Sequence, residues 1–120
     1  MLLYIVAASE DDETLYVFTS VKKAEQKAKS LGDFAHTFHD LAAGKARSDI
    51  GFELADAKVG DTVWVGHYTT DAGDGTWVTA PCRSEAEAYA AATALCKSKH
   101  LPKAARAGGG ELRAIQATVT

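Results

Sequence analysis

The stretch from Asp61 to Leu95, DTVWVGHYTTDAGDGTWVTAPCRSEAEAYAAATAL, decides the fold because it reads as strand, turn, strand and helix. Branched and aromatic residues recur from Val63 to Tyr68, which is typical of a strand packed on at least one face. Two glycines and two aspartates within 71–75 favour a turn. The pattern resumes from Trp77 to Thr79, so the segment predicts a β-hairpin.

A helix should follow the hairpin. Ser84 and Glu87 form a capping box. The Ser84 hydroxyl accepts a hydrogen bond from the backbone amide of Glu87, and the Glu87 carboxylate accepts one from the backbone amide of Ser84. Pro102 cannot continue a helix, so the end is expected near Lys99 or His100. One helix face carries small apolar side chains suited to close packing on a sheet: Ala88, Ala91, Ala92 and Leu95.

Residues 2–31 repeat this unit more loosely. Leu2–Ala8 and Leu15–Thr19 predict two strands, and Thr19 or Ser20 can cap a helix that Gly32 stops. A common spacing places Ser20 on Ser84, Ala24 on Ala88, Ala28 on Ala92 and Leu31 on Leu95. We therefore expect an internal duplication.

The remaining segments complete an α+β domain spanning residues 1–120. Asp33 can cap a short third helix over Phe34–Ala43, Phe52–Leu54 suggests a short extended segment, and Leu112–Val119 predicts a last strand. Residues 1–44 then form a β-hairpin-helix (ββα) unit plus the short helix, and 61–120 form a second ββα unit plus the C-terminal strand. We expect both units to share one antiparallel sheet with the helices on one face.

The composition is that of an ordinary globular domain, with 47% hydrophobic and 24% charged residues in 120 and a net charge of -3. No run approaches the roughly 20 apolar residues of a membrane span, and the start lacks the basic region of a signal peptide. We expect no membrane partner and a cytoplasmic location, the host cytoplasm for a phage-encoded protein. Cys82 and Cys96 lie too far apart along the predicted helix for a disulfide, so both should be reduced thiols.

The first hairpin carries four adjacent carboxylates at its tip: Glu10, Asp11, Asp12 and Glu13. They repel one another and should be solvated. One interpretation is a solubilising turn. The other is an acidic knob that binds a basic protein groove.

Lysines gather in two places: Lys22, Lys23 and Lys27 on the first predicted helix, and Lys97, Lys99 and Lys103 around and just beyond the end of the second. Lysines in a first turn oppose the helix dipole, which suggests that they are kept for binding an anion. No aromatic residue or arginine interleaves them in sequence, as a nucleic-acid platform would require. Solvated helix surface is the alternative.

Three histidines are candidate site residues. His36 and His39, three apart on the predicted third helix, could reach one metal ion, although surface histidines are the simpler interpretation. His67 shares a strand face with Val63 and Val65, so it is either a partly buried structural histidine or part of a site. The chain has no Gly-x-Ser-x-Gly elbow, and its carboxylates lie mostly in loops and helix starts, so we expect no enzyme and no cofactor.

The pattern MLLYIVAAS, then LYVFTS with Ala24 following, and again VGDTVWVG with Ser84 and Ala88 following, resembles small orphan proteins of phages and mobile elements built of hairpin-helix units. Some proteins of this kind are similar to anti-CRISPR inhibitors, which occupy a partner's surface. The resemblance implies a non-enzymatic protein-binding module. A nucleic-acid-binding accessory protein and a metal-dependent enzyme are the alternatives, and an exposed edge strand could support a homodimer.

Overall fold

The computed structural model describes residues 1–9, 13–36, 38–40, 46–47, 51–70, 76–96 and 110–120. The first half contains β1 (Leu2–Ser9), β2 (Glu13–Phe18), α1 (Val21–Leu31), a 3-10 turn η1 (Gly32–Phe34), β3 (Ala35–His36), β4 (Phe38–Asp40), β5 (Ala46–Arg47) and β6 (Phe52–Glu53). The second half contains β7 (Thr62–Thr70), β8 (Thr76–Val78), α2 (Glu85–Leu95) and β9 (Gly110–Thr118).

The described strands form two sheets rather than one. In the first sheet the order is β2-β1-β3, all antiparallel, and β6 also pairs with the start of β1. In the second sheet β8, β7 and β9 are antiparallel, and β4 and β5 extend it beyond β8. The fold is therefore α+β, with a three-stranded antiparallel group in each sheet.

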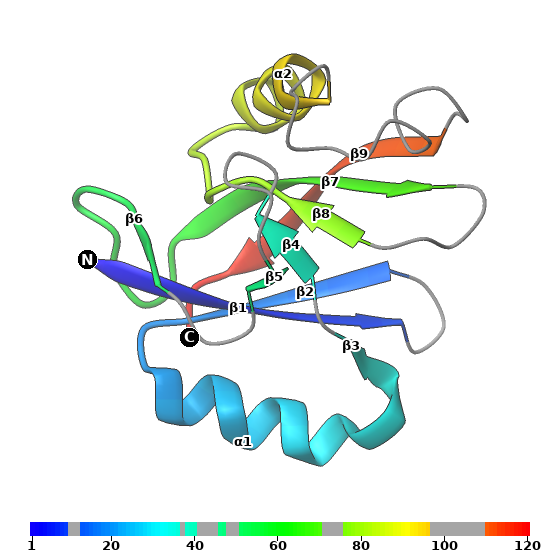
Figure 1. Cartoon of the computed structure of the whole chain (residues 1–120). Coiled ribbons are helices and arrows are strands. Elements are labelled where there is room, and N and C mark those ends of the chain that lie inside the picture. The colour runs from blue at the N-terminus through cyan, green and yellow to red at the C-terminus, as the bar shows by residue number, and fades with distance from the viewer. Residues whose placement is uncertain (10–12, 37, 41–45, 48–50, 71–75, 97–109) are drawn as a thin grey trace.

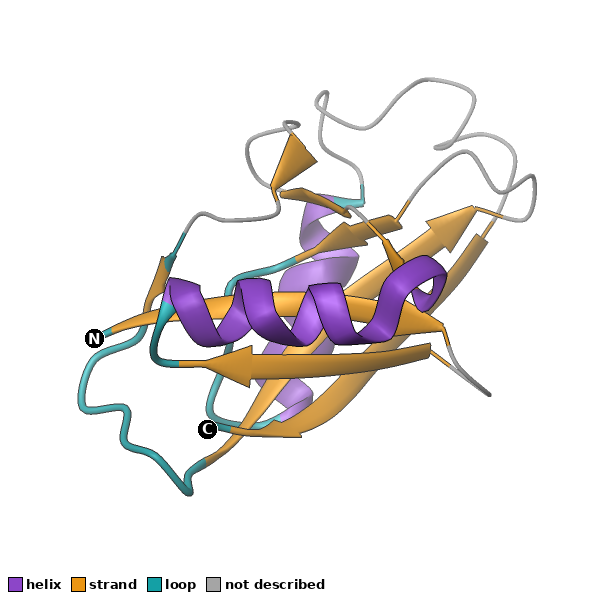
Figure 2. Ribbon diagram, turned by 90° about the horizontal axis from the view of Figure 1, so that it is seen from below, coloured by secondary structure: helices purple, strands orange, loops and turns teal. Residues whose placement is uncertain are grey.

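The layers run α1, first sheet, second sheet, α2 (Figure 1), and Figure 2 shows α1 lying across β1 and β2. The expectation of one shared sheet with both helices on one face is therefore wrong. The central strands β1 and β7 carry apolar side chains on both faces, as buried strands do. Each sheet is therefore covered by a helix on one face and by the other sheet on its second face. Ile5 faces the other sheet while Val6 packs under α1, and Val65 faces inward while Tyr68 packs near α2.

The two units nevertheless correspond as predicted at several positions. Ser20 and Ser84 are the N-caps of α1 and α2, accepting from the amides of Lys23 (3.5 Å) and Glu87 (3.2 Å). Ala24 and Ala88 are both buried beneath their helices. In each unit the first strand lies between its hairpin partner and a third strand that follows the helix.

The residues that follow the third strand of each unit pair with the other unit. β4, which follows β3 closely in sequence, pairs in parallel with β8, and Val119 after β9 forms a parallel bridge with Val17 of β2. These pairings tie the sheets together around one core. That core is built from both halves and includes Leu3, Ile5, Leu15, Val17, Phe52, Val63, Val65, Val78 and Val119.

The predicted third helix over Phe34–Ala43 is wrong. Among the described residues of this range, Phe34 ends the turn η1, Ala35 is extended with φ -78° and ψ 139°, and β3 and β4 follow. Residues 35 and 36 pair with Ala8 and Ala7, the side of β1 that its hairpin partner leaves open. The backbone of β1 at Ala7 and Ala8 is buried and needs hydrogen-bond partners. Supplying them stabilises the extended conformation more than the helical spacing of Phe34 and Phe38 would stabilise a helix.

Candidate functional site

β9 lies at an edge of the second sheet, and no strand of the described residues pairs with its side away from β7. Its full length pairs with β7, from Thr62 opposite Thr118 to Thr70 opposite Gly110. The Val119 amide donates to Asp61 on the β7 side (2.9 Å), whereas the Thr120 amide donates to Val17 on the opposite side (3.0 Å). Backbone groups alternate between the two sides of an antiparallel strand.

This alternation determines which groups point outward. The N–H and C=O groups of Leu112, Ala114 and Gln116 point away from β7, and no described strand pairs with them. A row of unpaired donors and acceptors at alternate positions is a template for another strand.

α2 lies above β7 and β9 and presents an apolar exposed side. Ala88 and Ala92 are buried against the sheet, whereas Ala86, Tyr89 and Ala90 are exposed, Tyr89 to 49%. A surface helix normally confines apolar residues to its buried face. The outward side of α2 is therefore more apolar than is usual for the solvent-facing side of a surface helix.

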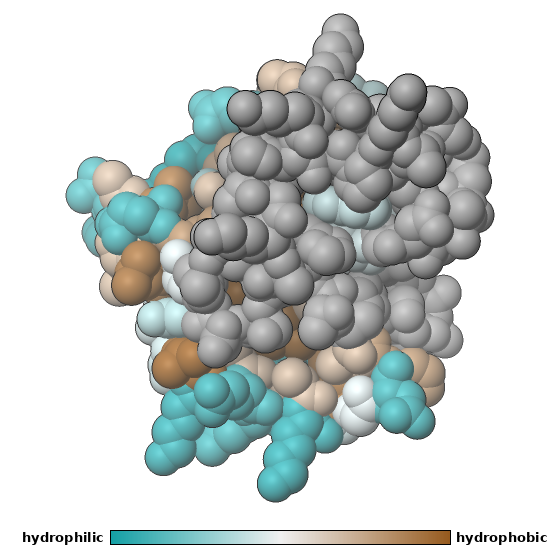
Figure 3. Space-filling view, viewed as in Figure 1, coloured by the Kyte–Doolittle hydropathy of each residue, from teal (hydrophilic) through white to brown (hydrophobic). Residues whose placement is uncertain are grey.

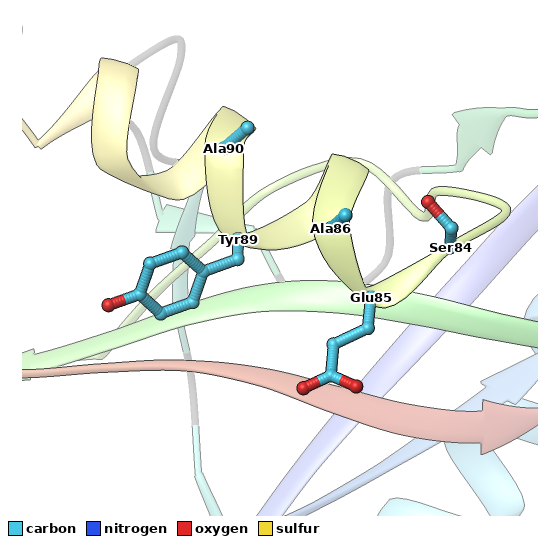
Figure 4. Close-up of a pocket in the computed structure, with 5 residues that line it drawn as sticks. All are labelled: Ser84, Glu85, Ala86, Tyr89 and Ala90. Atoms are coloured by element: carbon cyan, nitrogen blue, oxygen red, sulfur yellow. The ribbon is translucent and has the colours of Figure 1, made fainter.

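Figure 4 shows the side chains of Glu85 and Tyr89 extending from α2 toward the layer of β7 and β9. With Ser84, Ala86 and Ala90 they line an open depression of about 630 Å³. We call the outward edge of β9 (Leu112, Ala114, Gln116) together with this side of α2 (Glu85, Tyr89) the open flank.

A second depression, of about 410 Å³, lies at the seam where β2 meets the end of β9. Tyr16 and Phe18 of β2, Lys27 of α1 and Thr118 and Thr120 contribute to its lining. The Lys27 ammonium lies 4.4 Å from the centroid of the Tyr16 ring, a cation–π contact. The structure thus supplies an aromatic partner for one lysine that the sequence pattern did not reveal.

The other predicted lysines of α1, Lys22 and Lys23, are exposed. Hydrophilic residues gather over α1 at the bottom of the face in Figure 3. Lys97, Lys99 and Lys103 lie outside the described residues. Lys22 and Lys23 therefore lie on an exposed surface of α1, and the binding of nucleic acid by the two lysine clusters stays a prediction.

The acidic tip falls largely outside the described residues, since Glu10, Asp11 and Asp12 are not among them. Glu13 begins β2, and its backbone pairs opposite Ser9. The prediction that this segment joins the two strands of a hairpin is confirmed, and its role in binding stays a prediction.

His36 and His39 do not share a helix. His36 lies on β3 opposite Ala7, and His39 lies on β4 opposite Trp77, so the two residues pair with different sheets. The i, i+3 arrangement that suggested a shared metal ion requires a helix and is absent here. Across the described part of the chain, no three His, Cys, Asp or Glu side chains gather to hold a metal.

His67 lies on the inner face of β7 with Val63 and Val65, as the alternation predicts, and is only 1% exposed. Its backbone neighbours across the ladder are Val78 and Arg113. It is a buried residue of the layer between the sheets.

Both cysteines are free thiols, as predicted. Burial raises the pKa of Cys82, and the Glu87 charge adds to the effect. Burial also raises the pKa of Cys96. A raised pKa keeps a thiol protonated at neutral pH, and the thiol is a weaker nucleophile than the thiolate.

Sequence reasoning missed Tyr89 and the edge of β9 as a site. The sequence does contain a signal for Tyr89. On a helical projection Ala86 and Ala90 lie opposite Ala88, so the side of α2 that carries Tyr89 is apolar as well as the buried side. The open side of β9 carries no such signal, because strand order depends on contacts between distant segments.

Comparisons with known protein families, with curated proteins and with solved structures give no match for this chain. Neither described helix, at 11 residues each, is long and apolar enough to span a membrane.

Proposed function

We propose that this chain is a non-enzymatic protein-binding module that docks through the open flank. The observation that carries the proposal is the outward side of β9, with which no described strand pairs, together with the exposed Tyr89 of α2, the helix that packs on the same sheet. An extended strand can add to such an edge through main-chain hydrogen bonds, and a neighbouring aromatic side chain then supplies apolar contact area. Tyr is enriched among the residues that dominate binding energy at protein interfaces.

The proposal includes a role as a phage-encoded inhibitor of a host defence system. A small domain of this kind acts by covering a working surface of a larger protein, as anti-CRISPR inhibitors do. The acidic segment Glu10–Glu13 would then supply a second contact to a basic partner.

The experiment is an affinity capture from host-cell lysate with tagged protein, eluted in a salt series. Gln116→Pro blocks strand addition, since the amide of Gln116 points away from β7 and its loss removes no bond of the β7–β9 ladder. Tyr89→Ser removes the aromatic contact. Phe34→Ser is the matched control. Phe34 is an aromatic residue of similar exposure (54%, against 49% for Tyr89), and it follows α1 on the opposite side of the molecule from α2.

One stoichiometric protein that Phe34→Ser retains, and that Gln116→Pro and Tyr89→Ser both lose, would support the proposal. A partner lost only when Glu10–Glu13 are replaced by serine would move the binding site to the first hairpin. A protein partner bound equally by all the variants would exclude the open flank.

Nucleic-acid binding is a second candidate, favoured by the contact between Lys27 and Tyr16. Aromatic rings beside cations can stack bases while the cations hold phosphates. This function predicts a mobility shift of single-stranded DNA or RNA at low salt that weakens steeply as salt rises. Replacing Lys22 and Lys23 by serine should reduce that salt dependence, and the absence of any shift at low salt would remove the candidate.

A further inference from the structure

We propose that the depression at the seam of β2 and β9 binds a small organic anion, one that joins a carboxylate or phosphate group to a flat apolar body. We call it the seam depression, and its lining includes Tyr16, Phe18, Lys27, Thr118 and Thr120. None of these residues belongs to the open flank. The inference therefore goes beyond the proposed function and does not depend on it.

Three elements build the walls of the seam depression, and backbone hydrogen bonds hold two of them together. The Thr120 amide donates to the Val17 carbonyl (3.0 Å), and the Thr19 amide donates to the Thr120 carbonyl (3.1 Å). Val119 points into the core, so the exposed side chains of Thr118 and Thr120 on either side of it point outward. The third wall is α1, which packs on β1 and β2 (Figure 2). A ligand therefore meets a preformed site, which lowers the cost of binding.

The charge at the seam depression favours an anion. The ammonium of the half-buried Lys27 lies 4.4 Å from the centroid of the Tyr16 ring, and this contact holds it at the wall. None of the described residues that line the depression is acidic. The whole of α1 carries four lysines against Glu25, a net +3 in a chain whose net charge is -3. An anion is therefore attracted to this part of the surface.

The rest of the lining suits a flat apolar body. Leu15 and Val17 contribute apolar side chains, and Tyr16 and Phe18 contribute aromatic rings, which favour offset or edge contacts with another ring. The volume of about 410 Å³ lies within the range of roughly 300–1,000 Å³ that is usual for small-molecule sites. Such sites are mostly apolar, with a few polar groups that fix the orientation of the ligand.

The polar groups of the lining can supply that orientation. The Lys27 ammonium offers donors to an oxyanion, and two threonine hydroxyls lie on the opposite wall. The Thr120 hydroxyl bonds the Thr118 carbonyl (3.4 Å), so its position is fixed. A nucleic-acid strand would need several aromatic rings in line with cations. Among the described residues Lys27 with Tyr16 is the one such pair, which suits a single small molecule.

The test compares benzoate with benzamide, which share a ring and differ in charge, and titrates phenyl phosphate beside them. Amide chemical shifts of the full chain are followed by NMR. Both anions should shift Val17, Thr118 and Thr120 saturably, and benzamide should bind at least roughly tenfold more weakly because it lacks the charge-assisted contact. The tighter of the two anions identifies the oxyanion that the site prefers.

Two lysine variants of equal net charge separate a local contact from the general field of α1. Lys27→Met keeps the apolar stem of the side chain and should weaken benzoate binding roughly tenfold. Lys29→Met is the matched control, because Lys29 is exposed on the same helix and does not line the depression. It should change the affinity by less than about twofold, as screening at physiological salt predicts. Far-UV circular dichroism checks that both variants are folded.

Four results would overturn the proposal: no saturable shift with either anion, equal binding of benzamide, equal weakening by the two lysine variants, or shifts confined to residues outside the seam. An oligonucleotide that shifts the same amides while both anions fail would replace the small molecule by nucleic acid. Tyr89→Ser should leave benzoate binding unchanged. A failure of the seam depression and a failure of the open flank are therefore distinguishable.

Discussion

Gly66 of β7 lies directly beneath Ala88 of α2. A Cβ atom on Gly66 would lie 2.7 Å from the Ala88 carbonyl oxygen, and also 2.9 Å from the Cβ of Ala92. The close approach of α2 to the sheet therefore depends on a glycine at this position. This approach lets α2 pack against both β7 and β9.

Gly66→Ala should lower the free energy of unfolding by about 1–3 kcal/mol, the usual cost of overpacking a well-packed contact. The added methyl group meets backbone, which can move only if the whole helix shifts. Urea denaturation followed by circular dichroism measures the change. An unchanged unfolding midpoint would contradict the close packing of α2 on β7 at Gly66.

Thr79→Val should cost about 1–3 kcal/mol of stability, because it leaves a buried donor unpaired. The Thr79 hydroxyl accepts from the Gly66 amide (2.9 Å) and donates to the Ala80 carbonyl (3.0 Å) in a site that is 3% exposed. Thr93→Val is the matched control. Its hydroxyl bonds the Tyr89 carbonyl on the exposed side of α2, so the same chemical change there should have little effect on the urea midpoint.

Ser84→Ala should destabilise the fold by about 1 kcal/mol, the typical value of an N-cap. Ser20→Ala should cost less, since the Ser20 hydroxyl lies 3.5 Å from its amide whereas the Ser84 hydroxyl lies 3.2 Å from its own. Thermal unfolding of both variants makes the comparison. Equal losses would mean that the two caps contribute alike despite the difference in distance.

The Asp61 carboxylate should stabilise the fold at neutral pH and lose that effect in acid. Hydrogen bonds from Arg83 (3.1 Å) and the Lys58 amide (3.0 Å) hold the pKa of Asp61 below its ordinary value of 3.8. A lowered folded pKa contributes stability above the ordinary pKa and loses it as the pH falls through the folded pKa. Native protein should therefore exceed Asp61→Asn in unfolding midpoint at pH 7, and the gap should close in acid. A gap that does not change with pH would contradict the ion pair.

Both hairpins, both long helices and the last strand could be predicted from local signals. Each carries its own chemistry: Ser20 and Ser84 cap the helices, and Gly32 ends α1 with φ 58°. The way the sheets meet could not be predicted. Val6 and Tyr68 turn out to face helices on opposite layers, and only the continuous apolar run of β1 hints that both of its faces are covered.

The error at residues 34–43 has the same origin. Phe34 and Phe38 have helical spacing, but the open side of β1 at Ala7 and Ala8 supplies backbone partners that an isolated helix lacks. The candidate site depends equally on such distant contacts. Tyr89 could be recognised in sequence as an apolar residue on the wrong face of α2, whereas the outward groups of Ala114 become visible only once β9 is paired with β7.

The most direct measurement is amide hydrogen exchange along β9, residue by residue, by NMR in dilute protein and then in the bound state. The account predicts alternation in dilute protein: Arg113, Ile115 and Ala117 exchange slowly because they bond to β7, whereas Leu112, Ala114 and Gln116 exchange fast. Adding a captured partner should then slow the exchange of Leu112, Ala114 and Gln116 alone. Uniform slow exchange in dilute protein, or no change on binding, would contradict an open edge that serves as the docking site.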